Sequence, residues 1–97
     1  MAKKAKSQKS NGLADLLGKS VFVRAVTHYY TGRLVALSEE ALVLDDAAWI
    51  ADTGRFSAAI GTGALNEVEP FPGRVYVARA ALVDMCEWTH PLPRETK

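Results

Sequence analysis

Residues 21–46 constrain the fold more than any other part of the chain, because they predict three consecutive β-strands with short connections. Residues 21–26 are rich in β-branched side chains, which favours a strand buried on at least one face. Residues 30–38 hold Gly32 inside a strand pattern, where a glycine usually marks a bulge or a sharp bend. Residues 41–50 are apolar, then acidic, then apolar again. This order is how a small bent antiparallel sheet or barrel begins.

The length and composition of the chain limit the number of domains, the compartment and the kinds of partner that we expect. A chain of 97 residues is one domain with a modest core, so association with other copies would help its stability. It is 48% hydrophobic and 24% charged, which is ordinary for a soluble globular protein. The single cysteine, Cys86, excludes an internal disulfide framework and suits a reducing cytosol, so we expect a cytoplasmic protein. No apolar run approaches transmembrane length, and no membrane partner is expected.

The net charge of +1 is unevenly distributed along the chain. Residues 1–11 predict a disordered basic arm, because the first ten contain no acid. The arm either keeps the protein soluble or finds a phosphate backbone electrostatically, using Lys3, Lys4, Lys6 and Lys9. Ser10 or Asn11 is predicted to cap a short N-terminal α-helix, which Gly18 ends, with an apolar stripe of Leu13, Leu16 and Leu17.

The predicted body is one domain over residues 12–90, with strands at about 20–27, 29–38 and 40–51. The glycine- and proline-rich segment at about 53–73 predicts a mobile loop that stays outside the core, with one helical turn at 55–60. The strand pattern resumes over 74–88, with a bend near Ala80 that separates a fourth strand from a fifth. Residues 91–97, which contain two prolines and a charged end, are interpreted as a C-terminal tail.

This order of elements resembles the Sm-like family, including its bacterial Hfq branch. Residues 13–23 are similar to that family's helix and first strand, and Gly32-Arg33-Leu34 to the Gly-x-Leu of its bent second strand. Residues 42–46, LVLDD, resemble the hydrophobic and acidic stretch of its third strand. Residues 75–83, VYVARAALV, resemble both the Arg-Gly motif of Sm proteins and the Tyr-Lys-His stretch of the Hfq branch. The resemblance implies a mainly β fold: a small, strongly bent, five-stranded antiparallel barrel with a short N-terminal helix. A barrel of this type leaves its last two strands as exposed edges unless neighbouring copies pair with them. We therefore expect a homo-oligomeric ring of five to seven subunits, joined by main-chain pairing of the strands near residues 74–88.

The chain also departs from the family at the positions that read RNA. Uridine-binding Sm proteins usually carry an asparagine where Ala41 stands, and an aspartate where Ser38 stands. Their Arg-Gly pair becomes Arg79-Ala80 here. An asparagine amide reads a base edge because it both donates and accepts hydrogen bonds, which alanine cannot do. The fold can therefore be inherited without the RNA-reading residues.

Several residues remain candidates for RNA binding. His28, Tyr29 and Tyr30 place aromatic rings at a turn, where they either stack on bases or pack on the sheet. Arg79 either faces a phosphate or base in a ring pore or pairs with an acid of a neighbouring strand. Ser38 belongs to the loop that leads into the third strand.

Nothing in the sequence indicates catalysis. The two histidines and Cys86 share no metal-ligand spacing, so no metal site is expected. Asp45, Asp46 and Asp52 are more simply interpreted as a solvated turn than as a cation site. The chain has no glycine-rich phosphate loop and no nucleophile with an obvious base, so we expect neither a cofactor nor an enzyme.

Two functions follow from the resemblance. The first is a ring that binds single-stranded RNA through Arg79, the loop at Ser38, the turn at residues 28–30 and the lysine arm. The second is a structural or scaffold ring without specific RNA recognition, for example a phage or mobile-element relative of the Sm fold. The lysine arm and Arg79 favour the first function, which is the one that we predict from the sequence, with the scaffold ring as the alternative. Ala41 and the eleven acids against eight bases beyond the arm favour the second.

Overall fold

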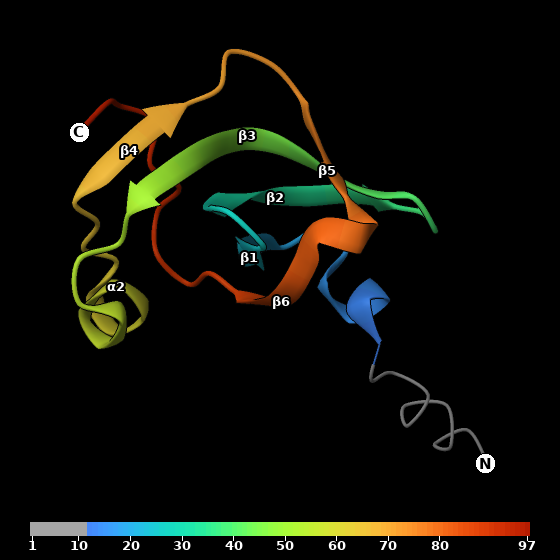
Figure 1. The fold of residues 1–97 in the computed structure, drawn as a ribbon, viewed down its shortest axis with the longest axis horizontal. Coiled ribbons are helices and arrows are strands. Elements are labelled where there is room, and N and C mark those ends of the chain that lie inside the picture. The colour runs from blue at the N-terminus through green and yellow to red at the C-terminus, as the bar shows by residue number, and fades with distance from the viewer. Residues whose placement is uncertain (1–11) are drawn as a thin grey trace.

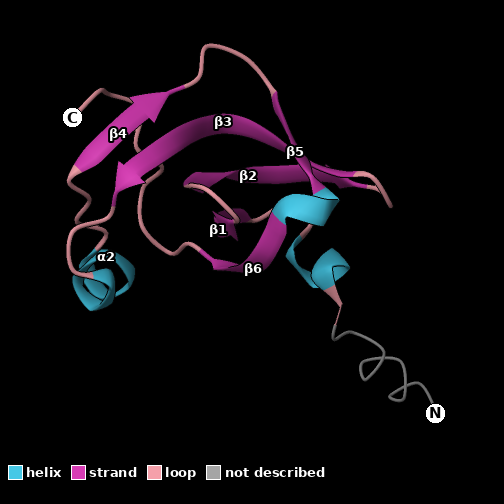
Figure 2. Ribbon diagram, in the orientation of Figure 1, coloured by secondary structure: helices cyan, strands magenta, loops and turns pink. Residues whose placement is uncertain are grey.

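The computed structural model describes residues 12–97, which form a mainly β structure around one antiparallel sheet (Figures 1 and 2). The strands are β1 (Ser20–Ala25), β2 (Tyr29–Leu37), β3 (Ala41–Asp52), β4 (Glu67–Pro70), β5 (Val75–Ala78) and β6 (Leu82–Glu87). A 3-10 helix η1 (Leu13–Leu16) precedes β1, an α-helix α2 (Phe56–Thr62) lies between β3 and β4, and a 3-10 turn η2 (Arg79–Ala81) joins β5 to β6. The strands pair in the order β4-β3-β2-β1-β6, and β5 also pairs with β3.

The long strand β3 pairs with two different strands along its outer edge (Figure 1). Residues 41–44 pair with β5, and residues 48–52 pair with β4. The turn η2 then carries the chain from β5 across to β6, which pairs with β1 at the far end of the sheet. The sheet curls through this connection, but no ladder between residues 12 and 97 joins β5 to β6, so it is not closed.

Gly32 and a bulge in β3 allow β2 and β3 to bend together. A Cβ added at Gly32 would lie 3.1 Å from the Leu44 Cβ and 3.2 Å from the Ala47 Cβ, so only glycine lets the strands approach this closely. The register shifts between Thr31 and Arg33, opposite Asp46, whose φ of 52° lies in the left-handed region. The expectation of a bend at Gly32 is confirmed.

The strands bury a different set of side chains on each face, because alternate residues point in opposite directions. One face forms a cluster around Val21, Leu34 and Leu44 inside the curl of the sheet. The other face forms a second cluster around Phe22, Ile50 and Trp88, which α2 helps to cover through Ala59.

The structure corrects several expectations. The sheet has six strands rather than five, and the N-terminal helix is 3-10 rather than α. The cap expected at Ser10 or Asn11 lies outside the described residues, as does the arm at residues 1–11. The segment at 53–73 forms α2, close to the expected helical turn, and also β4. The expectation that this segment stays out of the core was wrong, because Ala59, Leu65 and Val68 are buried.

The C-terminal segment, interpreted from the sequence as a tail, packs against the sheet. The main chain of Lys97 exchanges two hydrogen bonds with that of Val68 on β4, at 3.0 and 3.2 Å. Leu92 packs against the second core cluster, and the Trp88 indole donates to the Pro91 carbonyl at 3.2 Å. These contacts cover part of the outer edge of β4.

None of the helices found in residues 12–97 is both long and apolar enough to cross a membrane.

Candidate functional site

Ser38 and Arg79, two residues predicted for the site, lie together at one corner of the sheet. The Ser38 hydroxyl accepts hydrogen bonds from the N–H groups of Glu40 and Ala41, both at 3.1 Å, and so shapes the hairpin between β2 and β3. The Arg79 guanidinium donates to the Ser38 carbonyl, and the Arg79 N–H donates to the Glu40 carbonyl at 2.8 Å. Arg79 therefore binds main-chain oxygen rather than a carboxylate of a neighbouring strand.

The three aromatic residues of the turn at 28–30 do not form one surface. Tyr29 stacks on Phe22 with ring centroids 5.7 Å apart, whereas Tyr30 stacks on Phe71 at 6.3 Å, on the other face of β2. His28 lies 4.6 Å from the ring of Trp49. Each of the three is half-buried. Their rings are thus engaged in packing, which is the simpler of the two interpretations of this turn.

The charge of the described body gives little support to an RNA surface. Residues 12–97 contain eight basic and eleven acidic side chains, a net charge of 8 − 11 = −3. The predicted lysines, Lys3, Lys4, Lys6 and Lys9, lie outside the described residues. Among the predicted site residues within 12–97, Arg79 and Ser38 are the only two that are joined by a hydrogen bond.

Two strand edges on either side of η2 have no partner within residues 12–97. Strand β6 pairs only with β1, and β5 pairs only with β3. The Trp88 N–H donates to the Ser20 carbonyl, so the alternation of an antiparallel ladder points the main-chain groups of Met85 and Glu87 away from β1. The Arg79 N–H donates to the Glu40 carbonyl, so the same alternation points the main-chain N–H and C=O groups of Tyr76 away from β3.

Both free edges carry large exposed apolar side chains. Tyr76 on β5 is 67% exposed, and Val83 on β6 is 59% exposed. An unpaired strand edge offers N–H and C=O groups to another strand, and soluble proteins usually cover or blunt such an edge. These two edges, separated only by η2, are therefore the candidate site for main-chain hydrogen bonding to a strand of another copy.

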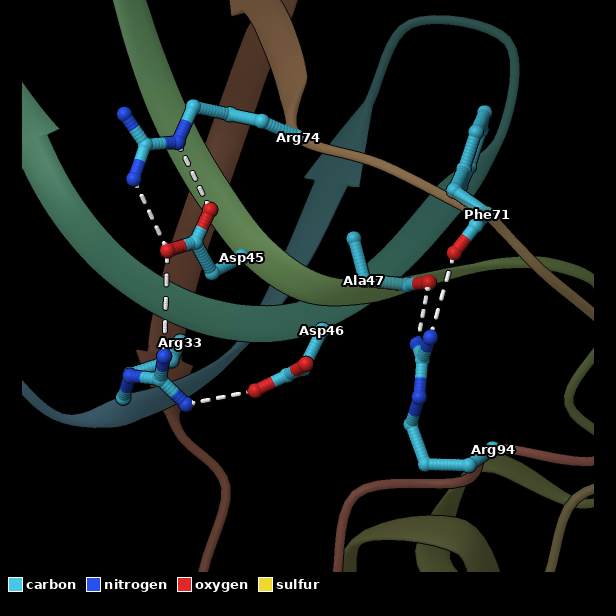
Figure 3. A network of polar contacts seen from close by, with 7 residues as sticks. All are labelled: Arg33, Asp45, Asp46, Ala47, Phe71, Arg74 and Arg94. Carbon is cyan, nitrogen blue, oxygen red and sulfur yellow. Dashed lines mark hydrogen bonds and ion pairs between the residues drawn. The ribbon is translucent and has the colours of Figure 1, made fainter.

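A second polar feature joins β2, β3 and the segments around β5 and the C-terminus (Figure 3). Arg74 binds the Asp45 carboxylate through two hydrogen bonds, at 2.7 and 2.9 Å. Arg33 donates to Asp46 at 2.7 Å and also approaches Asp45 at 3.7 Å. Arg94 donates to the carbonyls of Ala47 and Phe71, at 2.8 and 3.1 Å. We call these five charged side chains the arginine–aspartate cluster.

The ion pairs shift the acid–base properties of the groups they join. The hydrogen bond from Arg74 lowers the pKa of Asp45, and the charge of Arg33 lowers it further. The hydrogen bond from Arg24 likewise lowers the pKa of Asp84, across β1 and β6. Both carboxylates are therefore ionised at neutral pH and act as fixed negative charges.

The acidic residues do not assemble as a cation site. Asp52 accepts a hydrogen bond from the Gly54 N–H at 2.8 Å, whereas Asp45 and Asp46 lie in the middle of β3 beside arginines. Asp45 and Asp46 are thus not the solvated turn that the sequence suggested. In the part of the chain that the structure describes, no three His, Cys, Asp or Glu side chains are grouped as a metal would need.

No protein-family model matches the sequence, and no curated protein matches it.

Sequence reasoning missed the arginine–aspartate cluster because its members are distant along the chain, from Arg33 to Arg94. One signal was present. Asp45 and Asp46 are two consecutive acids inside an otherwise apolar strand, and such charges favour an oppositely charged neighbour on an adjacent strand.

Proposed function

We propose that this protein is a self-assembling ring protein of the Sm-like type, in which β5 of one copy pairs with β6 of the next. The observation that carries the proposal is the pair of unpaired edges at η2, with Tyr76 and Val83 exposed beside them. A head-to-tail contact between two different edges repeats around an axis and closes when the rotation allows it. The resemblance implies five to seven copies.

The order in which the strands pair along the chain supports a fold of the Sm-like type. After the bent β2, the strand β5 returns to β3, a short 3-10 turn follows, and β6 pairs with β1. This is the order that the resemblance implies for its last two strands. The extra helix α2 and strand β4 then form an insertion before β5.

The scaffold form of the ring is better supported than the RNA-binding form. The rings of Tyr29 and Tyr30 are occupied by packing, the body carries a net charge of −3, and Ala41 offers no side-chain hydrogen bond. These properties fit a ring with a structural role better than a ring whose pore recognises RNA bases.

Proline variants at two adjacent residues of β5 test the assembly. Proline removes one N–H donor. At Tyr76 the lost donor points to the free edge, whereas at Val77 it points to β3 inside the subunit. Tyr76→Pro should therefore give a folded monomer, while Val77→Pro should disrupt the subunit itself. Light scattering gives the mass, and circular dichroism reports the fold.

Tyr76→Phe is the matched control, because it keeps both the ring and the main-chain donor. We expect it to assemble like the unaltered protein. A monomer of the unaltered protein at micromolar concentration would overturn the proposal, as would a Tyr76→Pro variant of unchanged oligomeric mass.

RNA binding remains a second candidate because of the contact between Arg79 and Ser38. The Arg79 guanidinium uses one of its five N–H donors on the Ser38 carbonyl and has others for a phosphate. Binding of this kind is led by phosphate contacts, so its affinity falls with salt, with a log–log slope of roughly −0.7 for each phosphate neutralised on a single strand.

Fluorescence anisotropy with uridine-rich and adenine-rich oligonucleotides at several salt concentrations tests this candidate. Deleting residues 1–10 should flatten the salt dependence, and Arg79→Ala should weaken binding at every salt concentration. Discrimination between the two sequences should stay below one bidentate base contact, about 1–3 kcal/mol. No binding at low salt would leave only the scaffold ring.

A further inference from the structure

Three arginines converge on one recess at the arginine–aspartate cluster. The recess has a volume of about 220 Å³ and is lined by the five side chains of the arginine–aspartate cluster and by the segment that follows β4. The residues come from β2, β3, the connection into β5 and the C-terminal segment (Figure 3). Three of the eight basic side chains in residues 12–97 are therefore gathered in one place, on a body whose net charge is negative.

The charges in the recess do not cancel. Asp45 and Asp46 balance Arg33 and Arg74, with which they form ion pairs. Arg94 binds only carbonyl oxygens, and it forms no ion pair with any acid in the described part of the chain. The recess therefore carries a net charge of about +1 with both carboxylates already engaged, which favours an anion over a cation.

The arginines also retain unused donors. A guanidinium has five N–H donors, and Arg74 and Arg94 each use two of them in the bonds described above. Guanidinium groups bind phosphate oxygens with paired, charge-assisted hydrogen bonds, which gives geometric specificity as well as affinity. A phosphate group brings enough acceptor oxygens to meet three guanidinium groups at once. The volume also exceeds that of several water molecules, at roughly 30 Å³ each.

We propose that this recess binds a phosphate group, held by Arg33, Arg74 and Arg94. The phosphate is either free in solution or the terminal monoester of a nucleotide chain, since both present the same oxygens. The site lies apart from Ser38 and Arg79 and does not depend on ring formation. Asp46 limits its affinity, because it competes with the phosphate for Arg33.

Nuclear magnetic resonance of the arginine Nε–H groups, during a titration with inorganic phosphate against chloride at matched ionic strength, tests the site. Saturable shifts at the three arginines are expected. Arg94→Gln should weaken binding about tenfold, the loss of one charge-assisted contact. Arg55→Gln is the matched control and should bind phosphate normally, because Arg55 does not line the recess and forms no ion pair within residues 12–97.

Asp46→Asn provides the sharper test, because it should tighten phosphate binding several-fold by removing the competing charge. A purely structural role for the cluster gives no reason for a higher phosphate affinity in Asp46→Asn. This measurement also tests the proposal if Arg94→Gln fails to fold. A uridine oligonucleotide with and without a 5′-phosphate distinguishes the two sources. The proposal is overturned if neither phosphate nor the phosphorylated oligonucleotide saturates the site, or if Asp46→Asn leaves the affinity unchanged.

Discussion

The guanidinium of Arg79 donates to the main-chain carbonyl of Ser38, so the turn between the two free-edged strands is tied to the hairpin between β2 and β3. The main-chain bond from Arg79 to Glu40 reinforces this link. Together they hold β5 and η2 against the rest of the sheet. The orientation of the free edges therefore depends on this corner.

Removing the side-chain contact should loosen the corner without unfolding the protein. We expect Arg79→Ala to lower the free energy of unfolding by about 1 kcal/mol, a typical net value for one hydrogen bond near the surface. Arg55→Ala, at the start of α2, is the control and should change stability little. Urea denaturation measures both. Equal effects of the two variants would contradict a role for the Ser38 contact.

The two glycines Gly32 and Gly61 should respond in opposite ways to replacement by alanine. A Cβ at Gly32 would crowd Leu44 and Ala47, so we expect Gly32→Ala to destabilise the fold by about 1–3 kcal/mol. A Cβ at Gly61 in α2 meets no atom within 4 Å, so Gly61→Ala should stabilise the fold by up to about 1 kcal/mol. Thermal unfolding of both variants checks the signs. A neutral Gly32→Ala would mean that the strands can move apart.

Leu65 should contribute to stability although it lies in a segment that the sequence assigned to a loop. Its side chain is only 4% exposed, within the second core cluster. Leu65→Ala should therefore cost about 2–4 kcal/mol, the usual range for a buried leucine. Leu17→Ala is the matched control, because Leu17 is 44% exposed and should cost far less. Similar losses at both positions would show that the segment does not belong to the core.

The sequence was sufficient for the part of the fold that local pattern specifies. The expected strands at 20–27, 29–38 and 40–51 lie within two residues of β1, β2 and β3, because β-branched residues and one glycine determine their positions. Strand β4 was missed because it is only four residues long and contains a proline and two glutamates. It is extended through its pairing with β3, a tertiary contact that a local pattern does not record.

The candidate site was less predictable for the same reason. Arg79 was identified, but its contact with Ser38 depends on how η2 lies against a hairpin about forty residues earlier in the sequence. The arginine–aspartate cluster needs four segments to meet. The acids Asp45 and Asp46 indicate that a cross-strand partner is needed, but nothing in the sequence indicates which arginines supply it.

The free energy of unfolding should fall at acidic pH, because the carboxylates of Asp45 and Asp84 become protonated and lose their ion pairs. The folded pKa values of Asp45 and Asp84 are lowered by Arg74 and Arg24, so their contribution is fully present above the unfolded value of about 3.8. It is lost as the pH falls through the folded values. The stability difference between the unaltered protein and Asp45→Asn should therefore be constant near neutral pH and shrink below about pH 4.

Urea denaturation between pH 2 and pH 7 measures this difference. Asp15→Asn is the control for the loss of a carboxylate, because Asp15 forms no ion pair in the described part of the chain. A difference at Asp45 that grows on acidification would contradict the assigned direction of the pKa shift.

Amide hydrogen exchange at the free edges tests the central claim most directly, because it reports whether those N–H groups have partners. If copies assemble by pairing β5 with β6, the amides of Tyr76 and Met85 are protected in the assembled protein and lose that protection on dilution to monomer. The amide of Val77, which points to β3, keeps its protection in both states. An assembled protein in which the Tyr76 and Met85 amides exchange as fast as in the monomer would contradict edge pairing and place the interface elsewhere.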